Sequence, residues 1–163
     1  MRVRDIMIQD VYVAHERDVV RDVLKQFSMR RIGGMPIVSD DSRLVGYISD
    51  GDVMRALGKH YDMGPYLAFG AYFFPVDIDT FEGSDIDADS LRDNVLQVCA
   101  KNVMDIGRKR VISVSEDDDV VHVAELLAKK NIKKVPVVKE GKLVGIVSRG
   151  DVVRAVVQKF VTA

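Results

Sequence analysis

The chain has little of several features that define whole classes of proteins. Its 163 residues include one cysteine, Cys99, so an intramolecular disulfide framework is excluded. The 24 basic and 25 acidic residues nearly cancel, which argues against nucleic acid or an anionic membrane as a partner. No apolar run approaches the roughly 20 residues of a membrane-spanning helix, and the start "MRVRDIMIQD" lacks the apolar core of a signal peptide. We therefore expect a soluble, cytoplasmic protein.

Sequence signatures of catalysis and of metal binding are also missing. The three histidines and the cysteine form no close pair at metal-ligand spacing. No nucleophile, base and orienting partner are suggested by spacing, and "RRIGGMP" lacks the Gly-Lys-Ser/Thr ending of a phosphate-binding loop. We predict a protein that is not an enzyme, with no catalytic residue, no metal site and no resident cofactor.

What the sequence does contain is one stretch that occurs twice. "GYISDGDVMRAL" begins at Gly46 and "GIVSRGDVVRAV" begins at Gly145, an offset of 99 residues that also relates their Ser and Asp positions. Upstream, Pro36 and Pro136 are 100 residues apart, so the intervening turn differs by one residue. A fixed offset indicates duplication of one unit.

Both copies predict the same order of elements. A short extended piece precedes an amphipathic helix, two strands joined by a polar turn, and a second helix. The apolar face of the first helix comprises Val19, Val20, Val23, Leu24 and Phe27 in one copy, and Val120, Val123, Ala124 and Leu127 in the other. We predict an α/β (α+β) fold of two β-α-β-β-α repeats, residues 1–57 and 100–163. The repeats are expected to pack as one pseudo-two-fold module, because a single unit of this size buries little surface alone.

Residues 58–99 form an insertion without a counterpart in either copy. Seven of the 11 Phe and Tyr residues fall in its aromatic segment, 61–81, and acidic residues follow. Packing on the protein's own core, a self-association or partner surface, and a lid over a cleft all remain open for this segment. Residues 89–104 are predicted to be helical, with Leu91, Val95, Val98 and Cys99 on one face.

The repeated motif places a serine where a strand ends and a helix begins, and an aspartate three residues later. Ser49 with Asp52, and Ser148 with Asp151, therefore have the spacing of a capping box, which needs no ligand. The same helix start suits a phosphate, and the carboxylate can accept hydrogen bonds from ribose hydroxyls. Phosphate and ribose together indicate a nucleotide.

The order Gly-h-h-Ser-x-x-Asp-h-h (h apolar), preceded by an h-Pro-h-Val strand and present twice, resembles the tandem cystathionine-β-synthase (CBS) domain. "DIM" at Asp5 and "NVMD" at Asn102 also resemble the family's entry into each repeat. The resemblance covers roughly residues 1–57 and 100–160. It implies a stand-alone regulatory module with up to two clefts between the repeats, which bind adenosine derivatives such as AMP, ADP, ATP or S-adenosylmethionine.

The resemblance also implies roles for individual residues. Ribose would be held by Asp52 and Asp151, phosphate would face Ser49 and Ser148, and adenine would meet the backbone around Tyr12 and Ile112. Lys133 and Lys134 match the basic residues that the family often places before the strand proline, and Arg149 adds a charge beside Ser148. The corresponding residues of the first copy are Gly33, Gly34 and Asp50.

This asymmetry predicts inequivalent sites, with the Ser148/Asp151 cleft binding better than the other. Which cleft receives Lys133 and Lys134 stays open, as does the alternative that these lysines and Arg149 are solvated surface charges. The function expected from the resemblance is an adenine-nucleotide sensor of cellular energy state. It would form a homodimer and signal to an effector protein, still to be identified, by conformational change. The alternatives are an interaction scaffold with vestigial clefts, and binding of S-adenosylmethionine or NAD.

Overall fold

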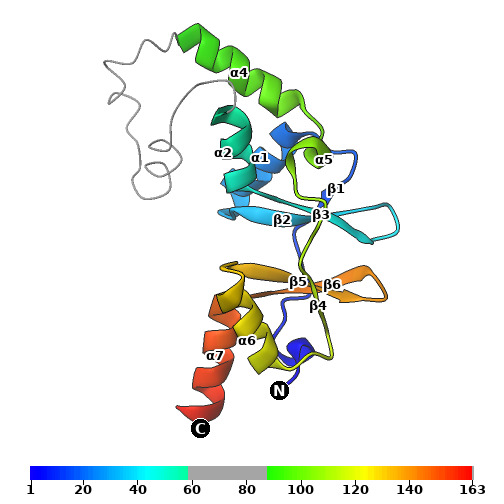
Figure 1. Ribbon diagram of the computed structural model, residues 1–163, viewed down its shortest axis with the longest axis vertical. Helices are drawn as coiled ribbons and strands as arrows, with labels where there is room; N and C mark the ends of the chain where they lie inside the picture. Colours follow the sequence, from blue (N-terminus) through cyan, green and yellow to red (C-terminus); the bar gives the residue numbers. More distant parts are fainter. Residues whose placement is uncertain (59–87, 163) are drawn as a thin grey trace. The chain divides into compact units, whose positions relative to one another are not determined.

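The computed structural model describes residues 1–58 and 88–162 (Figure 1). The predicted aromatic segment and most of the acidic residues after it lie outside these ranges. The first copy contains β1 (Ala14–His15), α1 (Val20–Arg30), β2 (Gly34–Val38), β3 (Leu44–Ser49) and α2 (Asp50–Gly58). The second contains β4 (Val114–Ser115), α6 (Val120–Lys129), β5 (Lys134–Lys139), β6 (Lys142–Ser148) and α7 (Arg149–Phe160). The predicted β-α-β-β-α order is confirmed in both.

Each copy forms its own three-stranded sheet, in the order β1-β2-β3 and β4-β5-β6. The first two strands of each sheet run parallel, with Ala14 opposite Ile37 and Val114 opposite Val137. Parallel neighbours need a crossover connection, which α1 and α6 provide. β5 and β6 are antiparallel and joined by a tight turn.

The contacts between residues divide the described chain into two compact units. One unit comprises residues 1–16, 35–47 and those from 109 onward, and its core lies between the β4-β5-β6 sheet, α6 and α7. Val120, Val123 and Leu127 are buried in this core and Ala124 packs against it, as their helical spacing predicts.

The other unit contains residues 17–34 and, among the described residues, 48–58 and 88–108. Here α4 (Ala88–Ala100) and α5 (Val103–Ile106) pack against α1 and α2 (Figure 1). Val20, Val23 and Phe27 of α1 are buried, as predicted, while Val19 and Leu24 are half-buried. The helices of the first copy are therefore covered by α4, from the segment between the copies, and by α5, from the entry segment of the second copy.

The buried face of α4 differs from the predicted one. Leu91 and Val95 are exposed, whereas Asn94 and Val98 are buried. Asn94 donates a hydrogen bond from Nδ2 to the carbonyl of Leu57, 3.0 Å away, at the end of α2. Asn94 and Val98 are four residues apart and lie on the same face of α4, so burying both leaves Leu91 and Val95 on the exposed side of the helix.

The entry segments of the two copies make the same contacts crosswise. Val3 donates its amide to the carbonyl of Asp118, at the start of the second copy's first helix, over 3.0 Å. In the same way Val103 donates to the carbonyl of Asp18, also over 3.0 Å. Each copy therefore has the entry segment of the other against the start of its first helix. Among the described helices none is both long and apolar enough to cross a membrane.

Candidate functional site

The Ser148/Asp151 pair forms a complete capping box at the start of α7. The Asp151 carboxylate accepts hydrogen bonds from the Ser148 amide (2.7 Å) and hydroxyl (2.6 Å), and the Asp151 amide donates back to the hydroxyl oxygen. Arg154, one turn further along α7, pairs with the other oxygen of the same carboxylate. The predicted cap is confirmed, and it fixes a buried carboxylate at a helix start.

Asp151 keeps its charge although its residue is only 7% exposed. Burial opposes that charge, but hydrogen bonds from the Ser148 hydroxyl and amide and from Arg154 outweigh it. The pKa of the Asp151 carboxyl therefore lies below its usual value.

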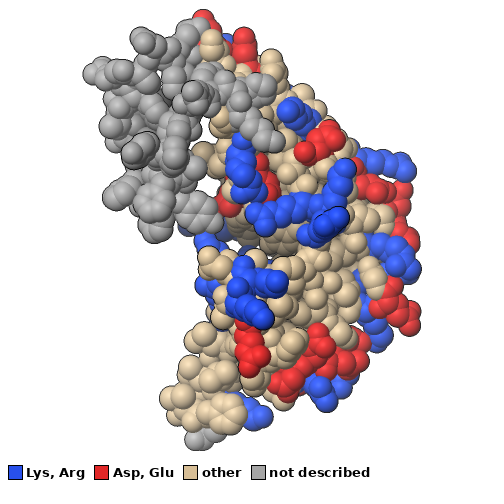
Figure 2. All heavy atoms as spheres, viewed as in Figure 1, with Lys and Arg blue, Asp and Glu red and all other residues tan. Residues whose placement is uncertain are grey.

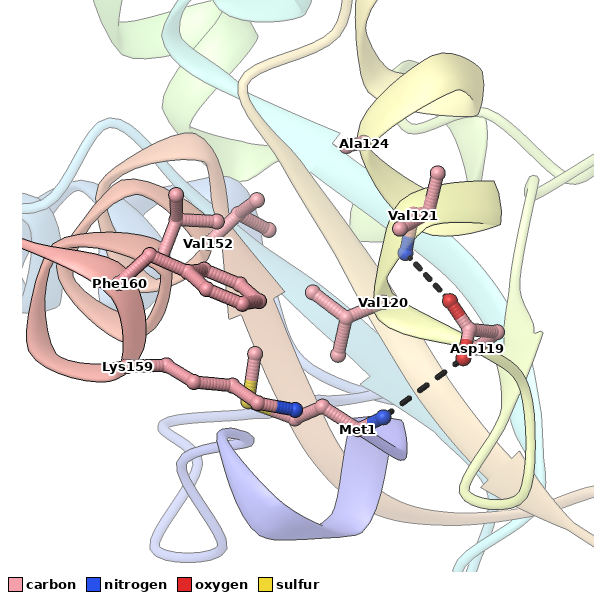
Figure 3. Close-up of a pocket in the computed structure, with 9 residues that line it drawn as sticks. Met1, Asp119, Val120, Val121, Ala124, Val152, Lys159 and Phe160 are labelled. Atoms are coloured by element: carbon pink, nitrogen blue, oxygen red, sulfur yellow. Dashed lines mark hydrogen bonds and ion pairs between the residues drawn. The ribbon is translucent and has the colours of Figure 1, made fainter.

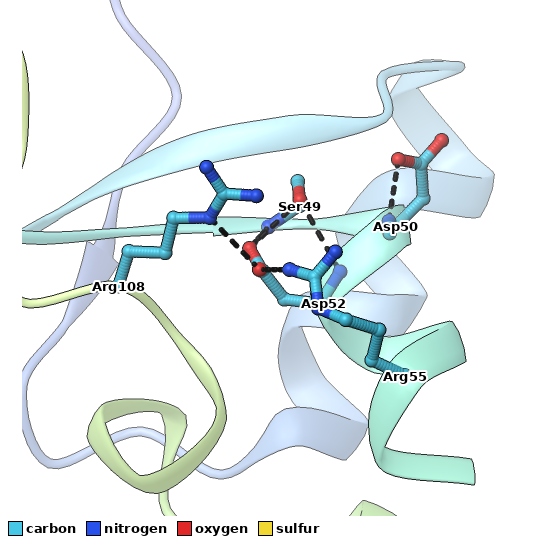
Figure 4. A network of polar contacts seen from close by, with 6 residues as sticks. Ser49, Asp50, Asp52, Arg55 and Arg108 are labelled. Carbon is cyan, nitrogen blue, oxygen red and sulfur yellow. Dashed lines mark hydrogen bonds and ion pairs between the residues drawn. The ribbon is translucent and has the colours of Figure 1, made fainter. Parts of the chain in front are cut away.

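The first copy has the same arrangement with one addition (Figure 4). Asp52 accepts hydrogen bonds from the Ser49 amide (2.9 Å) and hydroxyl (2.7 Å), and Arg55 pairs with it as Arg154 does with Asp151. Arg108 then donates from Nε to the same oxygen that Arg55 contacts, over 3.2 Å. Figure 4 shows the two guanidinium groups approaching the carboxylate from opposite sides.

The residue after each serine turns away from the carboxylate. Arg149 donates to the carbonyls of Leu127 (3.2 Å) and Ile132 (2.9 Å), so its guanidinium stabilises the end of α6. Asp50 instead accepts a hydrogen bond from the neighbouring amide of Gly51. It also lies over Gly33, where an added Cβ would come within 2.8 Å of its Oδ2.

Lys134 and Lys133 lie beside the second serine. Lys134 is opposite Ser148 in the β5–β6 register, and the carbonyl of Lys133 accepts the amide of Arg149. The structure thus brings together five of the predicted site residues at the junction of β6 and α7. Tyr12 and Ile112 are exposed on the segments that lead into β1 and β4.

Three arginines in these contacts were missed by the sequence interpretation. Arg55 and Arg154 stand at the same place in the duplicated stretch, so their shared position was a usable signal. Arg108 carries a weaker signal, because it opens the basic run Arg108–Arg110 where the first copy has "IQD" from Ile8. Within residues 1–58 and 88–162, no group of three or more His, Cys, Asp or Glu residues is arranged to hold a metal ion.

A second feature of the surface is an apolar face on α6 and α7. Its exposed side chains are Val121, Val153, Val156, Val157, Phe160 and Val161. The surface over the end of α7 is almost free of charged side chains in Figure 2. A pocket of about 210 Å³ opens between the two helices, with Val120, Val152 and Phe160 in its wall (Figure 3).

Comparison with known proteins gives a family and several relatives. The family model described as "CBS domain" matches residues 3–59 and 103–158. An uncharacterised protein of Methanocaldococcus jannaschii, MJ1426, is 30% identical over 162 residues, covering 96% of this chain and 92% of its own. The chloroplastic CBS domain-containing protein CBSX2 of Arabidopsis thaliana is 28% identical, and the match spans 60% of its length.

Two solved structures share the fold along nearly the whole chain. CBSX2 in complex with AMP has a TM-score of 0.68 at 25% identity, with 97% of each chain covered. The CBS domain pair of protein MJ0100, in complex with 5′-methylthioadenosine and S-adenosyl-L-methionine, has a TM-score of 0.66 at 26% identity, with 98% of each chain covered.

Proposed function

Because the chain belongs to the CBS domain family and carries two copies of the domain, we propose that it binds an adenine nucleotide reversibly and acts as a regulatory sensor. The observation that carries this proposal is the buried carboxylate at a helix start, present twice with the same serine and arginine partners. Complexes of two similar proteins, one with AMP and one with adenosine-containing thioethers and sulfonium compounds, support it.

In this proposal the carboxylates of Asp52 and Asp151 accept hydrogen bonds from ribose hydroxyls. Ser49 and Ser148 mark the helix starts near the phosphate, and the backbone around Tyr12 and Ile112 contacts adenine. Lys133 and Lys134 provide positive charge beside Ser148, while Arg149 contributes through its field as its guanidinium stays on α6.

Signalling requires that the ligand bind one conformation better than another, since only differential affinity shifts a population. An effector protein would detect that change, and a response to AMP, ADP or ATP would report the energy state of the cell. A cytoplasmic location and a non-catalytic role stay predictions of the same proposal.

We further propose that a second copy of the chain covers the apolar face of α6 and α7. In the first copy the corresponding helices, α1 and α2, pack against α4. The α6/α7 face has exposed valines and Phe160 instead. A two-fold axis would pair this face with itself, which is the commonest symmetry of soluble oligomers.

Calorimetric titration of the chain with AMP, ADP, ATP, S-adenosylmethionine and NAD tests the proposed function. Binding of at least one adenosine ligand, with one or two sites per chain, is the expected result. Absence of binding by all five, from protein shown to be folded, would remove the proposal and favour an interaction scaffold. The same titration decides whether S-adenosylmethionine or NAD, rather than an adenine nucleotide, is the ligand.

A further inference from the structure

The two carboxylates hold different numbers of hydrogen-bond donors. An ionised carboxylate has about four lone-pair sites. On Asp52 all four are taken, by the amide and hydroxyl of Ser49, by Arg55 and by Arg108. On Asp151 the described contacts are three, from the amide and hydroxyl of Ser148 and from Arg154. A ligand hydroxyl can therefore donate a hydrogen bond to Asp151 directly. At Asp52 the hydroxyl must first displace one of the existing donors.

Arg108 is the donor at Asp52 that a ligand can displace. Arg55 belongs to α2 and lies three residues after Asp52, so the helix holds it in place. Arg108 follows the end of α5, where its backbone forms an isolated β-bridge, and no helix holds its side chain, which is 62% exposed against 56% for Arg55. It is attached to the site by one 3.2 Å hydrogen bond.

The second copy has an apolar residue in the corresponding place. The entry segments are related by an offset of 100 residues, which pairs Arg108 with Ile8. Ile8 exchanges two backbone hydrogen bonds of 2.9 Å with Ile146 of β6, two residues before Ser148. Its side chain cannot donate to Asp151. The next residues extend the contrast in charge, since "KR" follows Arg108 and "QD" follows Ile8.

We propose that Arg108 makes the Asp52 site selective for phosphorylated adenosine ligands, while the Asp151 site discriminates less between a nucleotide and its uncharged nucleoside. This inference rests on the proposed function. A ribose hydroxyl takes the place of Arg108 on Asp52, and the released guanidinium binds the ligand's phosphate. A nucleoside must displace the same arginine but has no phosphate, so the released guanidinium gains no anionic partner.

Asp50 explains why the arginine is needed at this site. Its carboxylate lies at the same helix start and already takes the amide of Gly51, so it opposes a phosphate placed on the helix amides. A side chain from elsewhere then has to hold the phosphate, and Arg108, which contacts Asp52 over 3.2 Å, is the cation we assign to it. The Asp52 site therefore depends more strongly on the ligand's phosphate, a difference that the sequence prediction, which favoured the Ser148/Asp151 cleft, did not include.

The test is calorimetric titration of the full chain with AMP and with adenosine, in the wild type and in two matched variants. Arg108→Ile installs the residue of the second copy, and Arg92→Ile removes the same charge from an exposed position on α4. In the wild type, one site per chain should bind AMP at least about ten-fold more tightly than adenosine. R108I should lose that preference through weaker AMP binding, with adenosine affinity unchanged or increased, and R92I should retain it.

The outcomes separate this inference from the proposed function. If the wild type binds neither ligand, this inference is wrong, and the titration with all five ligands decides whether the proposed function fails with it. If R108I keeps the wild-type ratio, or weakens both ligands equally, nucleotide binding stands and the role of Arg108 is wrong. Ile8→Arg provides a second test should R108I not fold: it should add an AMP preference at the Asp151 site, and an unchanged ratio there would overturn the inference.

Discussion

Asp151 shows at the scale of one residue how the site maintains a buried charge. Burial disfavours the carboxylate, and the hydrogen bonds from Ser148 and Arg154, together with the charge of Arg154, keep its pKa low. A carboxyl whose pKa is lower in the folded state stabilises the fold at neutral pH. That stabilisation is complete well above the unfolded pKa of about 3.9 and is lost as the pH falls through the lower, folded value.

Asp151→Asn should therefore lower the free energy of unfolding by roughly 1–3 kcal/mol at pH 7, because the Ser148 and Arg154 donors lose a charged acceptor. The difference from the wild type should shrink as the pH falls from 7 to about 3, because the carboxyl of the unfolded wild-type chain takes up a proton below about 3.9, before the folded one with its lower pKa does. Urea unfolding at both pH values measures it. Asp105→Asn, at an exposed position, is the matched control and should show no such difference. A gap between D151N and the wild type that is independent of pH would contradict the account.

Arg149 provides a second test at this scale, because its sequence position and its contacts suggest different roles. Its guanidinium donates to carbonyls at the end of α6, so Arg149→Ala should cost about 1 kcal/mol of stability through the lost hydrogen bonds. AMP affinity should change less than about three-fold, since the guanidinium is held on α6 and an exposed charge that acts only through its field is largely screened. Lys134→Ala, beside Ser148, should weaken AMP binding more than it affects unfolding. Urea unfolding and calorimetry of both variants check this, and a large loss of AMP affinity in R149A alone would restore the phosphate role.

At the scale of an element, α4 shows where helical periodicity misleads. The spacing of apolar residues predicts a face through Leu91, Val95 and Val98, but the helix buries Asn94 with Val98. Periodicity ranks residues by hydrophobicity and gives no weight to a hydrogen bond with a carbonyl 37 residues away. The choice of face depends on that long-range contact.

Two valine substitutions in α4 distinguish the observed face from the predicted one. Val98 is 1% exposed and Val95 is 36% exposed. Val98→Ala should cost about 1–2.5 kcal/mol, the range for removing two buried methyl groups and leaving a cavity. Val95→Ala should change stability by less than about 0.5 kcal/mol. Urea denaturation of the pair measures the difference, and equal losses would support the periodicity-based face.

At the scale of the whole molecule, duplication made much of the fold predictable from sequence. The same spacing occurs in both copies, so each copy supports the element assignment of the other. The β-α-β-β-α order and both capping boxes follow from this local spacing. The contact of Arg108 with Asp52 joins residues 56 positions apart, and no periodic pattern in the sequence indicates it. The crosswise packing of the entry segments creates that contact, and only the structure shows it.

Despite the duplication, the helices of the two copies are covered differently, and this difference leads to a prediction about assembly. Helix α4 packs against α1 and α2, whereas the α6/α7 face has Val153 and Phe160 exposed. If a second copy covers this face, Val153→Asp should convert the dimer to a monomer, because a charge cannot be buried there without a partner. Light scattering coupled to size-exclusion chromatography gives the mass directly.

Met29→Asp, which adds the same charge at an exposed position near the end of α1, is the control and should leave the dimer intact. A wild type that is monomeric at high concentration, or a V153D variant that stays dimeric, would show that a second copy does not occupy this face. A V153D monomer that still binds AMP with wild-type affinity would place nucleotide binding within one chain. Association through the α6/α7 face would then be independent of nucleotide binding. An effector could bind this face without contacting the Ser49/Asp52 and Ser148/Asp151 sites.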